Sequence, residues 1–229
     1  MSVNILNISN SEEVKPFLLG ISSNLLQEAS KRVEFNSFIV ARSTVLTALV
    51  HNLSQAFPER KSATAVSAFY AFLVAKNLDW VNTQTIDQII LAALLQDIGL
   101  PKAREKLPPA SFEQFVLQHP EAFRSHPKEG LLLLQNIEHI PERVRQIIYQ
   151  HHEYCNGLGF PNGISAMRIY PPAKILSLVS GFVDDVLQNP NERPANTLKK
   201  FVSDREKVSR YDADCVRALI KLFIPEKSR

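Results

Sequence analysis

The sequence predicts an all-α protein, in which a bundle of helices is preceded by a helical extension at the N-terminus. Apolar residues recur at intervals of three and four along several segments, which is the spacing of one buried stripe on an α-helix. No segment shows the alternation of apolar and polar residues that is typical of a half-buried strand. The helical stripe is clearest between residues 61 and 78, where it consists of Val66, Phe69, Tyr70, Leu73 and Val74.

Several helix boundaries follow from residues that start or interrupt helices. Asn82 and Asp212 are suited to cap two helices, and Pro141 is suited to the first turn of a third. Glycine and proline predict loops at 99–109, 155–163 and 189–194. The helices expected besides 61–78 are 11–31, 37–56, 83–97, 127–136, 141–152, 172–188 and 212–223.

The chain length fits one large core, or one domain with an added helical segment. At 229 residues both arrangements are feasible, and we favour the second. We therefore expect an N-terminal helical extension over residues 1–58 and a functional domain over residues 59–229. The extension is either a docking or dimerisation element or a part of the core, and the sequence leaves both readings open.

Composition excludes several classes of protein. Hydrophobic residues make up 45% of the chain and charged residues 21%, as in an ordinary globular protein. The net charge is +3, but lysine and arginine are scattered, so no nucleic acid polymer is expected as a partner. The longest apolar run, at 89–95, is far shorter than the roughly 20 residues of a membrane span. Two cysteines and an N-terminus without a secretory pattern lead us to expect a cytoplasmic protein.

The stretch HHEYCNGLGFPNG, residues 151–163, places two histidines in front of a glycine-rich loop. At the end of the expected helix, His151 and His152 would point about 100° apart, so we expect them to face different surroundings. They could contact two neighbouring ions, or one ion and a ligand. The alternative is that both imidazoles only stabilise the negative end of a helix.

Two other helix ends carry residues of the same kind. Asp97 directly follows an apolar helix, and His126 is expected to open another. A buried carboxylate needs a cation or several amide donors, so Asp97 indicates either a metal site or an ordinary helix cap or ion pair. If these ends converge with that of His151, they bring imidazole and carboxylate groups together.

The order of these motifs over about 61–223 resembles the HD-GYP domains, a branch of the HD metal-dependent phosphohydrolases. The family pattern HDIGK reads QDIGLPK at 96–102, its HPxxG reads HPKEG at 126–130, and its HHExxDGxGYP reads HHEYCNGLGFP at 151–161. A late helix follows as KILSLVS at 174–180, then an Arg-Pro pair at 193–194 and YDA at 211–213.

The resemblance implies an HD-type helical bundle and a function in bacterial signalling. Active members hydrolyse cyclic di-GMP with two or three iron or manganese ions, because neighbouring cations polarise the phosphate and supply hydroxide at neutral pH. Mapped onto this sequence, the expected metal ligands are Asp97, His126, His151 and His152. The residues expected to contact the nucleotide are Lys102, Gly159, Phe160 and Pro161.

Several family positions carry other residues here. Ligands exclusive to one metal position map to Gln96, Ser180 and either Ala63 or Thr64. We therefore expect no dinuclear centre, and either a single Fe or Mn ion or none. Asp184, four residues after Ser180, or His51 could compensate for the missing ligands.

Further departures lie near the expected nucleotide contacts. The tyrosine of the GYP motif is Phe160, the preceding aspartate is Asn156, and the lysine after Ile-Gly is Leu100, for which Lys102 could substitute. The changed positions are those expected to bind metal or nucleotide, whereas the order of the motifs is kept. We therefore assign no catalytic residue.

The function expected is that of a degenerate HD-GYP protein of cyclic di-GMP signalling, acting as a non-catalytic adaptor or a nucleotide receptor. Its partner would be a protein, with the loop around Phe160 contacting a diguanylate cyclase-type domain, and a homodimer is compatible with the extension. Two alternatives stay open. One is an active metal-dependent cyclic di-GMP phosphodiesterase with a reduced or rearranged site, and the other is a helical module that binds neither metal nor nucleotide.

Overall fold

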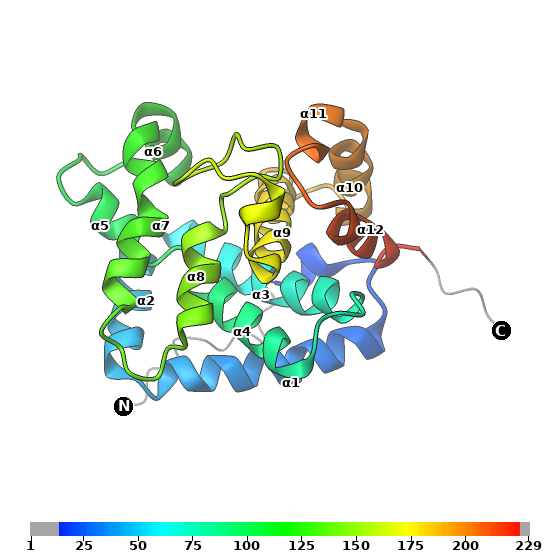
Figure 1. Cartoon of the computed structure of the whole chain (residues 1–229), viewed down its shortest axis with the longest axis horizontal. Helices are drawn as coiled ribbons and strands as arrows, with labels where there is room; N and C mark the ends of the chain where they lie inside the picture. Colours follow the sequence, from blue (N-terminus) through cyan, green and yellow to red (C-terminus); the bar gives the residue numbers. More distant parts are fainter. Residues whose placement is uncertain (1–13, 225–229) are drawn as a thin grey trace.

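The computed structural model describes residues 14–224, and these residues form helices and loops without a strand (Figure 1). An isolated bridge joins Asn156 to Ser165. The all-α prediction is therefore confirmed. The elements are η1 (Lys15–Leu18), α1 (Ser23–Ala41), α2 (Thr44–Ala56), α3 (Pro58–Lys76), α4 (Thr83–Leu95), α5 (Leu100–Arg104), α6 (Phe112–Gln118), α7 (Pro120–Leu134), α8 (Glu142–Gln150), η2 (Ala166–Arg168), α9 (Pro171–Gln188), α10 (Pro194–Ser203), α11 (Arg205–Val208) and α12 (Ala213–Lys221).

Helix α3 is the central element of the core. Its residues from Ala63 to Ala75 are all buried, and it packs against α4 and α9. A helix that is apolar on every side must be surrounded by other elements, which explains this position. Buried Tyr70 donates its hydroxyl to the carbonyl of Phe17 at 2.8 Å, and its ring meets Phe182 edge to face.

Helices α1 and α2 pack onto this core with different boundaries from those expected. The predicted helices 11–31 and 37–56 are replaced by Ser23–Ala41 and Thr44–Ala56, while residues 11–13 lie outside the described part. Ser43 marks the break, because its side chain caps the amide of Leu46. Apolar residues of both helices join the main core, while the boundary at residue 58 stays a prediction.

No single helix in residues 14–224 is long and apolar enough to cross a membrane, and α1 and α2 meet that test only as a pair bent by 106°.

A second apolar cluster joins α2, α5, α6 and α7. Its buried members are Leu53, Phe57, Leu100 and Phe115. Helix α6 was not expected from the sequence, although a capping box between Ser111 and Gln114 starts it. Helix α5 was not expected either, because the glycine and proline at 99–109 indicated a loop.

Helix α7 begins, and helix α8 ends, at a different residue from the one predicted, and both changes alter where the candidate histidines lie. Helix α7 begins at Pro120 and contains Pro127, so His126 lies inside it and does not open it. Helix α8 ends at Gln150, before both histidines of the pair. The expected helix at 172–188 is confirmed as α9, and Asp212 caps α12 as predicted.

Candidate metal centre

The carboxylate of Asp97 connects two groups of side chains. Asp97 follows the end of α4 and is 1% exposed. Its Oδ2 accepts hydrogen bonds from Nε of Arg60 at 2.9 Å and from Nη2 of Arg60 at 2.7 Å. Its Oδ1 lies 3.8 Å from Nε2 of His126. Burial opposes ionisation, but Arg60 outweighs it, so the pKa of Asp97 lies below its ordinary value and the group is a carboxylate.

Gly99 allows the turn after α4 to lie directly against α7. A Cβ atom on Gly99 would lie 2.1 Å from the carbonyl oxygen of His126 and 2.5 Å from the amide nitrogen of Gly130. No side chain fits there. This close backbone contact fixes Asp97 beside His126, and it gives a physical reason for the glycine in QDIGLPK.

Three imidazoles gather next to Asp97. His126 lies on α7, His151 and His152 follow α8, and one ring nitrogen of each lies within 4.8 Å of the others. The expectation that His151 and His152 face different surroundings is wrong. It assumed that the helix continues through both residues, whereas α8 ends at Gln150 and the turn after it brings both rings to one cluster.

Backbone carbonyl groups set the direction of two of these rings. Nδ1 of His126 lies 2.7 Å from the oxygen of Phe123, and Nδ1 of His151 lies 2.6 Å from the oxygen of Ile148. A carbonyl only accepts, so both Nδ1 atoms carry the proton. The two Nε2 atoms, 3.3 Å apart, then present lone pairs to each other in the buried site.

The surroundings favour neutral imidazoles. Burial, with the neighbouring His151, lowers the pKa of His126 to about 3. Burial also lowers the pKa of His151, and that of the partly exposed His152 falls well below its ordinary value. Neutral imidazole is the form that ligates metals, and a cation would relieve the repulsion between the facing lone pairs. The three imidazoles therefore fit one divalent transition-metal ion, and the Asp97 carboxylate lies beside them, 3.8 Å from His126.

Two aromatic rings lie against this cluster. Phe160 stacks on His152 with ring centroids 4.5 Å apart, and Phe123 meets both His126 and His152 at centroid distances of 5.0 and 5.4 Å. The guanidinium of Arg124 lies over the outer ring, 5.3 Å from the centroid of Phe160. His126 and His151 are 0% and 1% exposed. Their rings are thus shielded from solvent.

The positions to which the resemblance assigned ligands of a second ion carry neutral side chains that are already hydrogen-bonded. Ser180 donates its hydroxyl to Oε1 of Gln96 at 2.6 Å, and Nε2 of Gln96 donates to the hydroxyl of Ser67 at 3.4 Å. Thr64 donates to the carbonyl of Lys61 within its own helix. Neutral, mutually bonded groups do not fit a second divalent ion.

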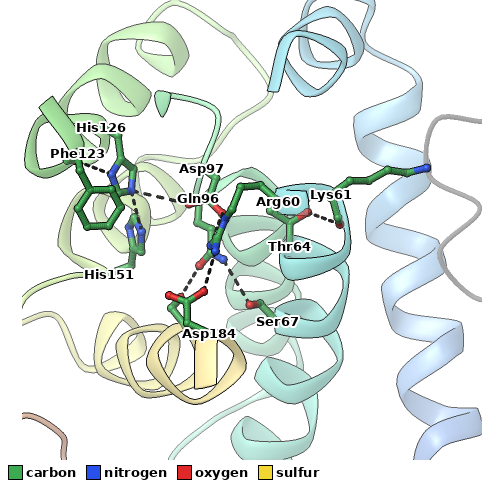
Figure 2. A network of polar contacts seen from close by, with 11 residues as sticks. Arg60, Lys61, Thr64, Ser67, Gln96, Asp97, Phe123, His126, His151 and Asp184 are labelled. Carbon is green, nitrogen blue, oxygen red and sulfur yellow. Dashed lines mark hydrogen bonds and ion pairs between the residues drawn. The ribbon is translucent and has the colours of Figure 1, made fainter. Parts of the chain in front are cut away.

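Asp184 and His51 were considered as replacements for the missing metal ligands, and neither is available as a ligand. Asp184 does reach the site from α9, but its Oδ1 accepts a hydrogen bond from Nη1 of Arg60 at 2.7 Å (Figure 2). His51 is exposed on α2. The charge of Asp184 is therefore matched by a protein cation.

Arg60 is the residue of this site that the sequence reasoning missed. Its side chain is 7% exposed, and its guanidinium lies 4.4 Å from the centroid of the Phe112 ring. Burial alone would lower the pKa of Arg60, but Asp97 and Asp184 raise it above its ordinary value, so the charge is permanent. The signal that could have identified Arg60 is its position one helical turn before Thr64, one of the two positions to which the resemblance assigned a metal ligand.

The residues expected to contact nucleotide lie in two separate places. Lys102 is exposed on α5 and pairs with Glu105 at 2.5 Å. Gly159 lies against the backbone of the histidine segment, where a Cβ would be 2.4 Å from the oxygen of His152. Phe160 is 9% exposed, and a cis peptide bond joins it to Pro161.

Glu153 holds this loop and was also missed. Its carboxylate is buried and accepts the amide of Asn162 at 2.7 Å and the amide of Ile164 at 3.0 Å. The glutamate of the HHE motif thus acts on the backbone of the loop. The loop in turn exposes the apolar side chains of Leu158, at 74%, and Met167, at 96%.

Comparison with known proteins agrees with this architecture. The sequence matches the model of the HD domain family over residues 44–215. The structure is similar to Bd1817, an HDG"Y"P protein from Bdellovibrio bacteriovorus, with a TM-score of 0.55 and 17% identity, covering 96% of this chain and 76% of that chain. It is also similar to the HD domain of the L. monocytogenes phosphodiesterase PgpH in complex with cyclic-di-AMP, with a TM-score of 0.49 and 14% identity, covering 76% of this chain and 94% of that chain.

No curated protein sequence matches the chain. At 17% identity the likeness to the Bdellovibrio structure supports the fold alone. The match to the family model spans most of the chain and includes Asp97 and all three clustered histidines. The chain therefore belongs to the HD domain family.

Proposed function

We propose that this chain is a non-catalytic protein of cyclic di-GMP signalling, which works by binding a protein partner or the nucleotide. The observation that carries the proposal is the hydrogen bond of 2.6 Å between Ser180 and Gln96. Both residues stand where the family places ligands of one metal ion, and here they satisfy each other. Without those ligands a pair of cations cannot be held against mutual repulsion, and two-metal activation of a phosphodiester is lost.

Shielding of the remaining cluster supports the same conclusion. His126 and His151 are almost fully buried, and Phe123 and Phe160 lie against His126 and His152, so a phosphate could reach the imidazoles only if side chains around them moved. Lys102, expected near the phosphate, is paired with Glu105 on the surface. The groups that would bind and activate a phosphodiester are thus covered or directed elsewhere.

The loop after the histidines is the proposed contact surface, with a diguanylate cyclase-type domain as partner. Leu158 and Met167 expose apolar side chains, and Glu153 fixes the loop backbone between them. A loop whose backbone is already fixed loses little backbone entropy when its apolar side chains bind a partner. Within the loop that the sequence suggested as the contact surface, Phe160 is suited to support the backbone, because its ring packs on His152.

One observation favours a second candidate, an active cyclic di-GMP phosphodiesterase with a reduced site. The cluster of His126, His151 and His152 beside Asp97 still fits one metal ion. A single ion can polarise a phosphate oxygen and lower the pKa of bound water. The residues that would hold this ion are these four, and the chemistry it would supply is that of a Lewis acid.

A hydrolysis assay with added Mn²⁺ or Fe²⁺ separates the two candidates. We expect no turnover of cyclic di-GMP by the purified chain at either ion. Sustained turnover that disappears in His126→Ala would overturn the non-catalytic proposal. Calorimetric titration of the same protein with cyclic di-GMP, and with a purified diguanylate cyclase domain, tests the binding role. Absence of heat in both titrations would favour the purely structural alternative.

A further inference from the structure

Arg60 binds the two carboxylates of this site as a metal ion would. Its guanidinium donates two hydrogen bonds to Oδ2 of Asp97 and one to Oδ1 of Asp184. The three residues come from α3, from the turn after α4 and from α9. One cation therefore joins three elements that are distant in the sequence.

The bond pattern of Asp97 is that of a bridging carboxylate. One oxygen faces the imidazole cluster, and the other is engaged twice by the guanidinium. A carboxylate that bridges two cations uses its two oxygens in this way. Here one of the two cations is supplied by the protein itself.

The guanidinium is well suited to a fixed position. Its planar fork donates to several acceptors at once in a rigid geometry, which a lysine ammonium cannot match, and it stays charged at any ordinary pH. The ring of Phe112 lies 4.4 Å from it and limits its movement. A divalent ion placed between Asp97 and Asp184 would have to displace this group or remain close to its positive charge.

We propose that Arg60 is a built-in cation that replaces a second metal ion, and that it masks a latent divalent-cation site formed by Asp97 and Asp184. Removing the guanidinium leaves two acidic side chains that face the same vacated space, one of them buried. Two carboxylates completed by water are suited to hard ions such as Mn²⁺. The inference rests on the same altered metal position as the proposed function. It holds even if the chain hydrolyses cyclic di-GMP with a single ion.

The test compares metal binding by the wild type and Arg60 variants. Purified Arg60→Ala is dialysed against Mn²⁺, and bound metal is counted by elemental analysis beside the wild type. We expect one additional equivalent in Arg60→Ala, and none in Arg60→Lys, which keeps the charge. The double variant Arg60→Ala/Asp184→Asn should lose the additional ion. An equal metal count in folded Arg60→Ala and wild type would overturn the proposal.

A wild-type measurement keeps the test decisive if Arg60→Ala does not fold. Titration of wild-type protein with Mn²⁺ should saturate at no more than one equivalent per chain. A second tightly bound equivalent would overturn the proposal. Hydrolysis by a wild-type protein that holds one ion would instead contradict the non-catalytic function and leave the role of Arg60 standing, so the two failures are distinguishable.

Discussion

The imidazoles of His126 and His151 face each other through their Nε2 atoms at 3.3 Å, while a backbone carbonyl holds the opposite nitrogen of each ring. Two neutral rings in this arrangement repel each other, because each presents a lone pair to the other. Such an arrangement is stable when a proton or a metal ion lies between the nitrogens. The depressed pKa of both residues makes the metal ion the better occupant near neutral pH.

The first prediction is that the purified protein binds one divalent transition-metal ion through this cluster. His126→Ala should remove the site, since it deletes the imidazole that lies nearest to Asp97. At a free metal concentration about 100 times Kd, binding should stabilise the wild type by roughly 2.7 kcal/mol. Thermal unfolding with and without EDTA measures the difference.

His139→Ala is the matched control, because His139 is exposed between α7 and α8. It should keep the full stabilisation by metal. If His126→Ala retains the same metal-dependent stabilisation as His139→Ala, the ion is bound elsewhere and the assignment of this cluster is wrong.

The second prediction concerns the pH dependence of stability without metal. Folding lowers the pKa of His126 from its usual value to about 3, and the pKa values of His151 and His152 fall in the same direction. Unfolded histidine, with a pKa of about 6.5, then binds more protons than the folded protein, so the free energy of unfolding decreases as pH falls below about 6.5. The expected slope approaches roughly 1.4 kcal/mol per pH unit for each histidine.

Urea unfolding in EDTA between pH 8 and pH 5, chosen to span that pKa of about 6.5, measures this slope. The lowered pKa of Asp97 adds a loss of stability only near and below the usual carboxyl value of about 4, so it does not contribute at pH 5. His126→Gln should reduce the slope, because it removes one of the imidazoles with a lowered pKa. A flat profile in the wild type would show that these imidazoles are protonated or exposed in the folded protein.

The all-α fold could be read from the sequence because helix periodicity is local. The apolar spacing around Phe69 and Tyr70 was sufficient to place α3, and Asp212 marked the start of α12. Helix ends were less predictable. The apolar stripe of α1 continues through Val33 to Val40, across the gap that was expected near residue 35, and the break comes only before Ser43, which caps α2.

The candidate site was partly predictable, for a similar reason. Motif order brought Asp97 and the histidines to attention, and the structure places them together. Arg60 was not predicted, because its partners lie 37 and 124 residues away and its role exists only once α3, α4 and α9 are packed. The role of Glu153 depends in the same way on how the following loop returns to it.

The third prediction tests the close contact that places Asp97. Gly99→Ala would put a methyl group 2.1 Å from the carbonyl oxygen of His126, and backbone must move to relieve the clash. We expect a loss of about 3 kcal/mol in the free energy of unfolding and weaker metal binding. Chemical denaturation and metal titration of the same variant give both values.

Gly130→Ala provides a contrast at the other side of this contact. A Cβ there meets its nearest atom, Cγ2 of Ile148, at 3.5 Å, and the residue lies within helix α7. Alanine should be tolerated or should stabilise the helix by up to about 1 kcal/mol. Equal losses in both variants would mean that the contact at Gly99 is not the cause.

The fourth prediction concerns Glu153 and the loop that it holds. Glu153→Gln replaces one carboxylate oxygen with an amide nitrogen, which donates and cannot accept, so the backbone amide of Asn162 or of Ile164 loses its partner. We expect a loss of roughly 1–3 kcal/mol in stability and faster proteolysis between Leu158 and Met167. Limited proteolysis followed by mass spectrometry locates the cleavage, and Glu138→Gln on the exposed turn after α7 is the control.

Glu153→Gln should also bind a diguanylate cyclase domain more weakly without changing the metal content, because the loop lies outside the set of metal ligands. Weaker binding accompanied by loss of metal would instead mean that Glu153 acts through the imidazole cluster.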